Sequence, residues 1–252
     1  MGGAHLPRAG YYRLLSAWRG LFYVRKVMEM VRIISGVVLD ILPHASGFLF
    51  AEMTFDEGGE EKVCFFSYEQ DKQDCFPVTA KTYLTHKFGP YYRDVIDEIG
   101  DFISCDAAPL GKNGTAIVYE SGEMYIFDGL GKQVWKGVVS YQHKSIRDLA
   151  VDGKDIWCVV PERNAVICYS PAEARVTLRI GGMDSAAFDE PVSISKNENL
   201  LYVSSRKARK VRTIRLPDYE VADHCKFREP VHKFFKVGGC EYAVLDSGVY
   251  EM

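Results

Sequence analysis

The chain has 252 residues, of which 47% are hydrophobic, 26% charged and 13% aromatic, and this composition excludes a disordered protein. The 31 lysine and arginine residues face 34 aspartate and glutamate residues, so the formal net charge of -3 excludes a general binder of nucleic acid or anionic membrane, although not a local basic patch. No stretch reaches the roughly 18 uninterrupted apolar residues of a membrane-spanning helix, so we expect no membrane span.

Residues 1–27 differ in composition from the rest of the chain. They are rich in arginine and contain no acidic residue. Such a segment fits an amphipathic transit peptide, a weak membrane-surface helix, or an upstream extension if translation starts at Met28 or Met30. We favour the extension, because a regular pattern of strands begins directly after it. The chain is therefore divided into a leader, 1–27, and a core domain, 28–252.

From Met28 onward, short apolar strands alternate with turn residues, and helical periodicity is scarce, which predicts an all-β fold. Five units share this pattern, at 37–78, 102–136, 146–180, 191–223 and 231–252. The last unit lacks a fourth strand, which residues 29–34 can supply from the other end of the chain. A spacing of about 45 residues is typical of a four-stranded propeller blade. We predict a single β-propeller of about five blades, with six as the alternative, whose last blade is closed by an N-terminal strand.

Segment 80–100 interrupts this pattern. Tyr92, Val95, Ile96 and Ile99 have the spacing of one helix face, and Gly100 can end a helix. We expect a partly helical linker between the first and second blades, lying over one end of the ring.

The third and fourth units resemble NHL-type propellers and their gluconolactonase-like and lyase relatives. The resemblance rests on 180–194, where a glycine pair is followed by Phe188-Asp189-Glu190-Pro191, and on the strands at 201–204 and 211–214. Glu229-Pro230 repeats the last part of this motif. The family usually has six blades, so segment 80–100 could instead hide a degenerate blade.

In a propeller, the loops that enter the inner strands line the mouth of the central channel. The charged residues at these positions form a candidate site for a small polar ligand, and they are Asp101, Arg147, Glu190 and Glu229. Two histidines, His143 and His232, are also placed near the channel. The same residues equally suit solvated turns that bind nothing.

The resemblance also implies an alternative, a metal-assisted lactonase-like hydrolase or a lyase at the central channel. Asp101, Glu190 and Glu229 would then be oxygen ligands of a divalent cation or acid–base groups. The family's Glu/Asn/Asp ligand trio does not map onto the matching positions, and no nucleophile elbow, phosphate-binding loop or dinucleotide motif occurs. We therefore assign no catalytic or metal-binding residue and expect no cofactor, with a divalent cation as the alternative.

A basic run lies between the second and third strands of the fourth unit, and its members are Arg206, Lys207, Arg209, Lys210 and Arg212. A cluster of this kind can contact phosphates, so RNA binding is a second alternative. It contains no aromatic residue for base stacking, however, and it also suits a solvated hairpin.

The seven cysteines are widely spaced and form no C-x-x-C motif, which favours reduced thiols and a cytoplasmic protein. From these observations we predict a monomeric, non-catalytic propeller that binds a partner protein or a small polar ligand on one face, and not nucleic acid.

Overall fold

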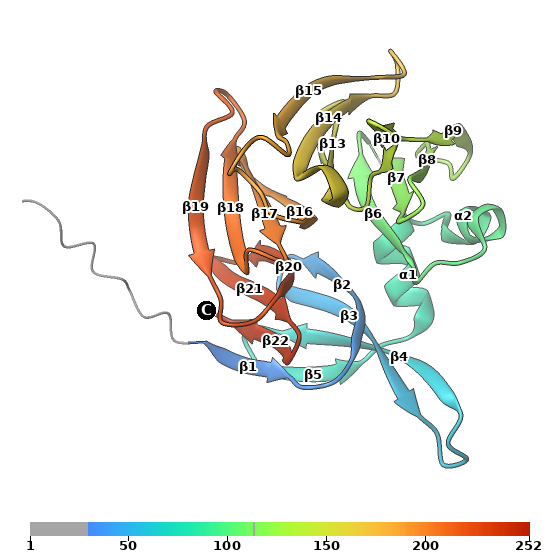
Figure 1. Cartoon of the computed structure of the whole chain (residues 1–252). Coiled ribbons are helices and arrows are strands. Elements are labelled where there is room, and N and C mark those ends of the chain that lie inside the picture. Colours follow the sequence, from blue (N-terminus) through green and yellow to red (C-terminus); the bar gives the residue numbers. More distant parts are fainter. Residues whose placement is uncertain (1–29, 113) are drawn as a thin grey trace, which may run out of the picture.

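The computed structural model describes residues 30–112 and 114–252, which form a β-propeller of five four-stranded antiparallel blades (Figure 1). The predicted leader lies outside the described residues. In each of blades 1 to 4, the strands follow one another in chain order from the centre of the ring to its rim. No helix in the described parts of the chain is both long and apolar enough to cross a membrane.

The blades are defined by the following strands. Blade 1 contains β2 (Val38–His44), β3 (Gly47–Phe55), β4 (Glu61–Glu69) and β5 (Asp74–Pro77). Blade 2 contains β6 (Cys105–Leu110), β7 (Gly114–Tyr119), β8 (Glu123–Phe127) and β9 (Gln133–Val138). Blade 3 contains β12 (Leu149–Asp152), β13 (Asp155–Val160), β14 (Ala165–Ser170) and β15 (Arg175–Gly181).

The remaining blades and small elements complete the ring. Blade 4 contains β16 (Pro191–Asn197), β17 (Leu200–Ser205), β18 (Lys210–Arg215) and β19 (Val221–Lys226). Blade 5 contains β20 (Val231–Val237), β21 (Cys240–Leu245), β22 (Gly248–Glu251) and β1 (Val31–Ile34). Outside the blades lie a two-stranded ribbon, β10 (Ser140–Tyr141) and β11 (Lys144–Ser145), and a short 3-10 turn at Pro161–Arg163.

The burial of each strand follows its place in the blade. The middle strands β7, β13, β14 and β17 are buried along almost their whole length, because neighbouring blades cover both of their faces. The outer strand β15 alternates between exposed and partly buried residues, as expected of a strand with one face in water. The continuous apolar runs in the sequence are therefore the middle strands, which form the cores between blades.

Blade 5 closes the ring, as the sequence predicts, because β1 pairs with β22 at its rim (Figure 1). Val31 pairs with Glu251, so segments from opposite ends of the described chain share one sheet. Gly248 begins β22 with a φ of +137°, and a Cβ atom there would lie 2.0 Å from the carbonyl oxygen of Ile34. Glycine is thus needed where the closing strand makes its closest approach.

Segment 80–100 forms two helices, α1 (Ala80–Phe88) and α2 (Tyr92–Ile99), which join blades 1 and 2. Thr79 caps α1 by accepting the backbone N–H of Thr82 at 3.1 Å. Buried residues of both helices, including Phe88 and Val95, share one apolar core with Leu49 of blade 1 and Ile117 of blade 2. The helices therefore pack between two blades and do not lie over an end of the ring. They stand where a six-bladed ring would place another sheet.

Candidate functional site

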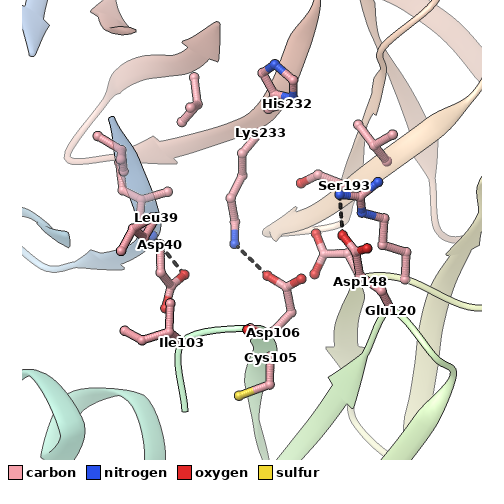
Figure 2. A pocket seen from close by; sticks show the side chains of 16 residues that line it. Leu39, Asp40, Ile103, Cys105, Asp106, Glu120, Asp148, Ser193, His232 and Lys233 are labelled. Carbon is pink, nitrogen blue, oxygen red and sulfur yellow. Dashed lines mark hydrogen bonds and ion pairs between the residues drawn. The ribbon is translucent and has the colours of Figure 1, made fainter. Parts of the chain in front are cut away.

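A cavity of about 220 Å³ lies at the centre of the ring, where the inner strands begin. Each blade contributes at least one polar side chain to its lining, and a set with one member from each of blades 1 to 5 consists of Asp40, Asp106, Asp148, Ser193 and Lys233 (Figure 2). We call these five residues the channel cluster.

Irregular starts of the inner strands position several members of the cluster. The pairing register shifts just before Asp40 in β2, before Ser193 in β16 and before Lys233 in β20. Such bulges change the direction in which a strand presents its side chains. In blades 3 and 2, the residues at the corresponding positions are Asp148, directly before β12, and Asp106, the second residue of β6.

Lys233 reaches across the cavity from blade 5 to blade 2 (Figure 2). Its ammonium group donates a hydrogen bond to Asp106 Oδ1 at 3.1 Å. Burial alone would lower the pKa of Lys233, but the carboxylates of Asp106, Asp148 and Asp40 outweigh it and raise that pKa above its ordinary value. The lysine is therefore charged at neutral pH and acts as the internal cation of the channel.

A buried lysine supports the cluster from outside the cavity. Lys87 of α1 donates hydrogen bonds to Asp40 Oδ2 at 2.6 Å and to the carbonyl oxygens of Phe102 and Cys105. Burial alone would raise the pKa of Asp40, but the nearby ammonium groups, that of Lys87 first, hold it below its ordinary value. Asp40 is thus ionised, and the helical segment is bonded directly to the channel.

Asp148 is the carboxylate of the cluster without a close cation. Its side chain accepts the backbone N–H of Leu149 at 2.7 Å and that of Ile194, in the next blade, at 2.9 Å. No lysine or arginine among the described residues forms an ion pair with it within 4.0 Å. The residue is only 3% exposed. Burial and the neighbouring Asp106 carboxylate raise the pKa of Asp148 to about 7.

Ser193 lies beside Asp148 and is also 3% exposed. Its Oγ lines the cavity and lies close enough to the Asp148 carboxyl group to act on the pKa of that acid as a hydrogen-bond donor. No other described residue offers this hydroxyl a partner. The cavity therefore contains a buried carboxyl group and a buried hydroxyl side by side, with no described lysine or arginine paired to them.

An ion pair and a histidine–carboxylate contact border the cavity. Arg147, directly before Asp148, pairs with Glu120 from the loop between β7 and β8. On the blade 5 side, His232 Nε2 lies 2.5 Å from Asp246 Oδ1. The side chains of both pairs are partly or largely exposed, so they form the rim of the site.

Among the four residues predicted from the sequence as a ligand site, Arg147 lines the cavity. The other three hold loops in their own blades. Asp101 accepts the backbone N–H groups of Ile103 and Ser104, Glu190 pairs with Arg206, and Glu229 accepts hydrogen bonds from the N–H and hydroxyl of Ser247. Of the two histidines placed near the channel, His232 lines the cavity. Within 30–112 and 114–252, no three His, Cys, Asp or Glu side chains are grouped to hold a metal ion.

The residues of the channel cluster, apart from their neighbours Arg147 and His232, were not predicted from the sequence. A usable signal exists, because each member is a polar residue near the start of an otherwise apolar inner strand. Leu39-Asp40-Ile41 and Val192-Ser193-Ile194 show this pattern. The prediction of the ligand site stopped at residues that precede the cluster, by one position in blade 3, three in blade 4, four in blade 5 and five in blade 2.

The basic run spans the turn between β17 and β18 and the first residues of β18. Four of its five side chains face carboxylates, and the pairs are Arg206–Glu190, Lys207–Asp189, Lys210–Asp223 and Arg212–Asp223. Arg209 donates to the backbone carbonyl of Arg228 at 2.9 Å. The positive charge of this hairpin is therefore largely balanced within the blade.

No protein-family model matches the chain, and no curated protein matches it. Among solved structures, a streptogramin B lyase aligns with 88% of this chain and 96% of its own, at 10% identity and a TM-score of 0.52. Virginiamycin B lyase from Staphylococcus aureus aligns with 85% of this chain and 79% of its own, at 9% identity and a TM-score of 0.50. Sqt1 from Saccharomyces cerevisiae aligns with 85% and 71%, at 11% identity and a TM-score of 0.47. At 9–11% sequence identity, these matches show a similar fold and nothing more.

Proposed function

We propose that this propeller is a non-catalytic binding module that takes a small polar ligand in its central cavity. The observation that carries the proposal is the Asp148 carboxyl group, which is buried beside the Ser193 hydroxyl, faces the cavity and forms no ion pair with a described lysine or arginine. Buried polar groups in proteins are nearly always satisfied. A bound ligand would supply the missing partner.

The size and chemistry of the cavity limit the ligand. Its volume of about 220 Å³ is below the 300–1,000 Å³ typical of sites for drug-sized compounds, so a ligand of few heavy atoms fits. The channel cluster offers both donors and acceptors, whereas Val38, Leu39 and Val192 provide an apolar wall. A compact molecule with a polar end suits this lining.

One feature favours binding over metal-assisted hydrolysis. The carboxylates proposed as metal ligands, Asp101, Glu190 and Glu229, are each engaged in a different blade. The lyases that share the fold carry no argument about activity, because their sequence identity to this chain is about one tenth.

A compound library tests the proposal. Small amines, carboxylates, amino acids and polyols are screened for a rise in melting temperature, since a ligand of the native state stabilises it by mass action. The hits are then tested on Ser104→Trp, which places an indole at the exposed cavity mouth, and on Ser185→Trp, an exposed serine outside the lining. We expect binding to be lost only in Ser104→Trp. The absence of any hit, or equal binding by both variants, would overturn the proposal.

A further inference from the structure

The charges around the cavity do not balance. Three carboxylates, the buried ones of Asp40 and Asp148 and the partly exposed one of Asp106, share two ammonium groups. Lys87 lies 2.6 Å from Asp40, and Lys233 lies 3.1 Å from Asp106. Among the described residues, no ammonium group pairs with the third carboxylate, that of Asp148. The site is therefore short of one positive charge at this position.

We propose that the ligand of the cavity carries a primary ammonium group, which binds between the Asp148 carboxylate and the Ser193 hydroxyl. This inference rests on the proposed function and specifies the chemical class of its ligand. It follows from a buried carboxyl group that forms no ion pair within 30–112 and 114–252, with a buried hydroxyl beside it, both lining one cavity.

The hydrogen-bonding capacity of the two residues fits such a group. Asp148 uses one acceptor position for Leu149 and one for Ile194, and a carboxylate has about four. Ser193 Oγ can accept as well. An ammonium group has three N–H donors and no acceptor, so it can satisfy both residues at once. The apolar side chains of Val192, Val38 and Leu39 lie close enough to line the same cavity and to cover a short hydrocarbon body.

Binding of this ligand is coupled to a proton. The ammonium group pairs only with the ionised form of Asp148, which burial and Asp106 disfavour below about pH 7. The ligand therefore displaces a proton from that carboxyl group as it binds, and its apparent affinity rises with pH up to this value.

The other charged or titratable groups that line the cavity or adjoin Asp148 are Asp106 of β6, Lys233 and His232 of β20, Cys158 of β13, Asp40 of β2, the adjacent Arg147 and Glu120 of the loop between β7 and β8. The pKa of Cys158 is raised by burial, so it stays a neutral thiol, and the raised pKa of Lys233 keeps it charged. The pKa of Asp148, about 7, places its own change of charge near neutral pH.

The experiment uses three probes of nearly equal size, butylamine, 1-butanol and butyrate, titrated into the protein and followed by NMR. At pH 8 we expect butylamine to bind at least tenfold more tightly than the other two. Its dissociation constant should rise about tenfold for each pH unit below about 7 and level off above it, because binding requires the ionised acid.

Variants locate the site. Asp148→Asn should weaken butylamine binding at least tenfold and abolish its pH dependence, and Ser193→Ala should weaken it several-fold while the pH dependence remains. Ser204→Ala is the matched control, because Ser204 pairs with Ser193 across the sheet and is also buried without a partner, but lies outside the cavity lining. Should Asp148→Asn not fold, Ser193→Ala and the pH dependence of the wild type decide the question.

The outcomes separate the two proposals. If butanol or butyrate binds in a manner that depends on Ser193 and butylamine does not, the ammonium class is wrong and the cavity remains a binding site. If butylamine binds equally to Asp148→Asn, or without pH dependence, the inference is also wrong. If neither these probes nor any library compound binds, both proposals fail together.

Discussion

Lys87 is a lysine whose side chain has no exposed surface, and it connects three parts of the molecule. Its ammonium group bonds to Asp40 of blade 1 and to two carbonyl oxygens of the segment that leads into blade 2. Breaking a buried ion pair from one side leaves an uncompensated charge, whereas replacing both partners by apolar residues is often neutral. The two kinds of replacement therefore have different consequences.

For Lys87→Met we expect a loss of about 3–5 kcal/mol in the free energy of unfolding, because the Asp40 carboxylate is left buried without its closest cation. The double variant Lys87→Met/Asp40→Leu should recover a large part of that loss. Urea unfolding of the two variants and the wild type measures both values. A cost below about 1 kcal/mol for the single variant would show that the pair is screened by solvent.

For single residues, the sequence shows which side chains carry charge, but it does not show which side chains they contact in the fold. Arg147 and His232 could be placed near the channel from their position before or in an inner strand. The carboxylates that balance the basic run could not be identified from the sequence. Glu190 and Asp223 lie on either side of the run in the sequence and meet it only through strand pairing. The start of an inner strand likewise depends on its neighbours, and β12 begins at Leu149, three residues after the predicted strand.

The two helices between blades 1 and 2 are part of the core. Their periodicity could be read from Tyr92, Val95, Ile96 and Ile99, because helix spacing is a local property. The position of these helices could not be predicted, because it depends on which apolar surfaces of blades 1 and 2 are left uncovered by other strands. Phe88 is 3% exposed within that shared core, whereas Phe55, beside the turn between β3 and β4, is 68% exposed.

These two phenylalanines offer a matched test. Phe88→Ala should lower the free energy of unfolding by about 3–5 kcal/mol, because it leaves a cavity between two blades. Phe55→Ala should change it by less than about 0.5 kcal/mol, as is usual for an exposed side chain. Thermal or urea unfolding gives both numbers. Similar small effects for both would mean that the helices contribute little to the core.

At the scale of the whole molecule, the repeated strand pattern predicted the ring and its closing strand, because each blade repeats the same alternation of buried runs and turns. The number of blades was less certain from the sequence, because segment 80–100 is long enough to suggest a degenerate sheet. Five sheets and a helical pair complete the ring instead.

Closure depends on Gly248, where a side chain would meet the backbone of Ile34. Gly248→Ala should therefore cost more than about 2 kcal/mol and remove hydrogen-exchange protection from β1 before the other strands. Gly153→Ala is the control, because Gly153 also has a positive φ, +62°, but has no atom within 4 Å of an added Cβ. We expect a cost of about 1 kcal/mol there and unchanged protection of β1. Equal effects of the two substitutions would contradict a specific role in closure.

The pairing of β1 with β22 also has a consequence for the order of synthesis. Val31 and its partner Glu251 are 220 residues apart in the chain. At about 5–20 residues per second, β1 waits on the order of ten seconds or more before its partner strand exists. During that interval blades 1 to 4 can form, while β1 remains an unpaired strand with open backbone groups. The nascent chain is thus exposed to mispairing of β1 until β22 emerges.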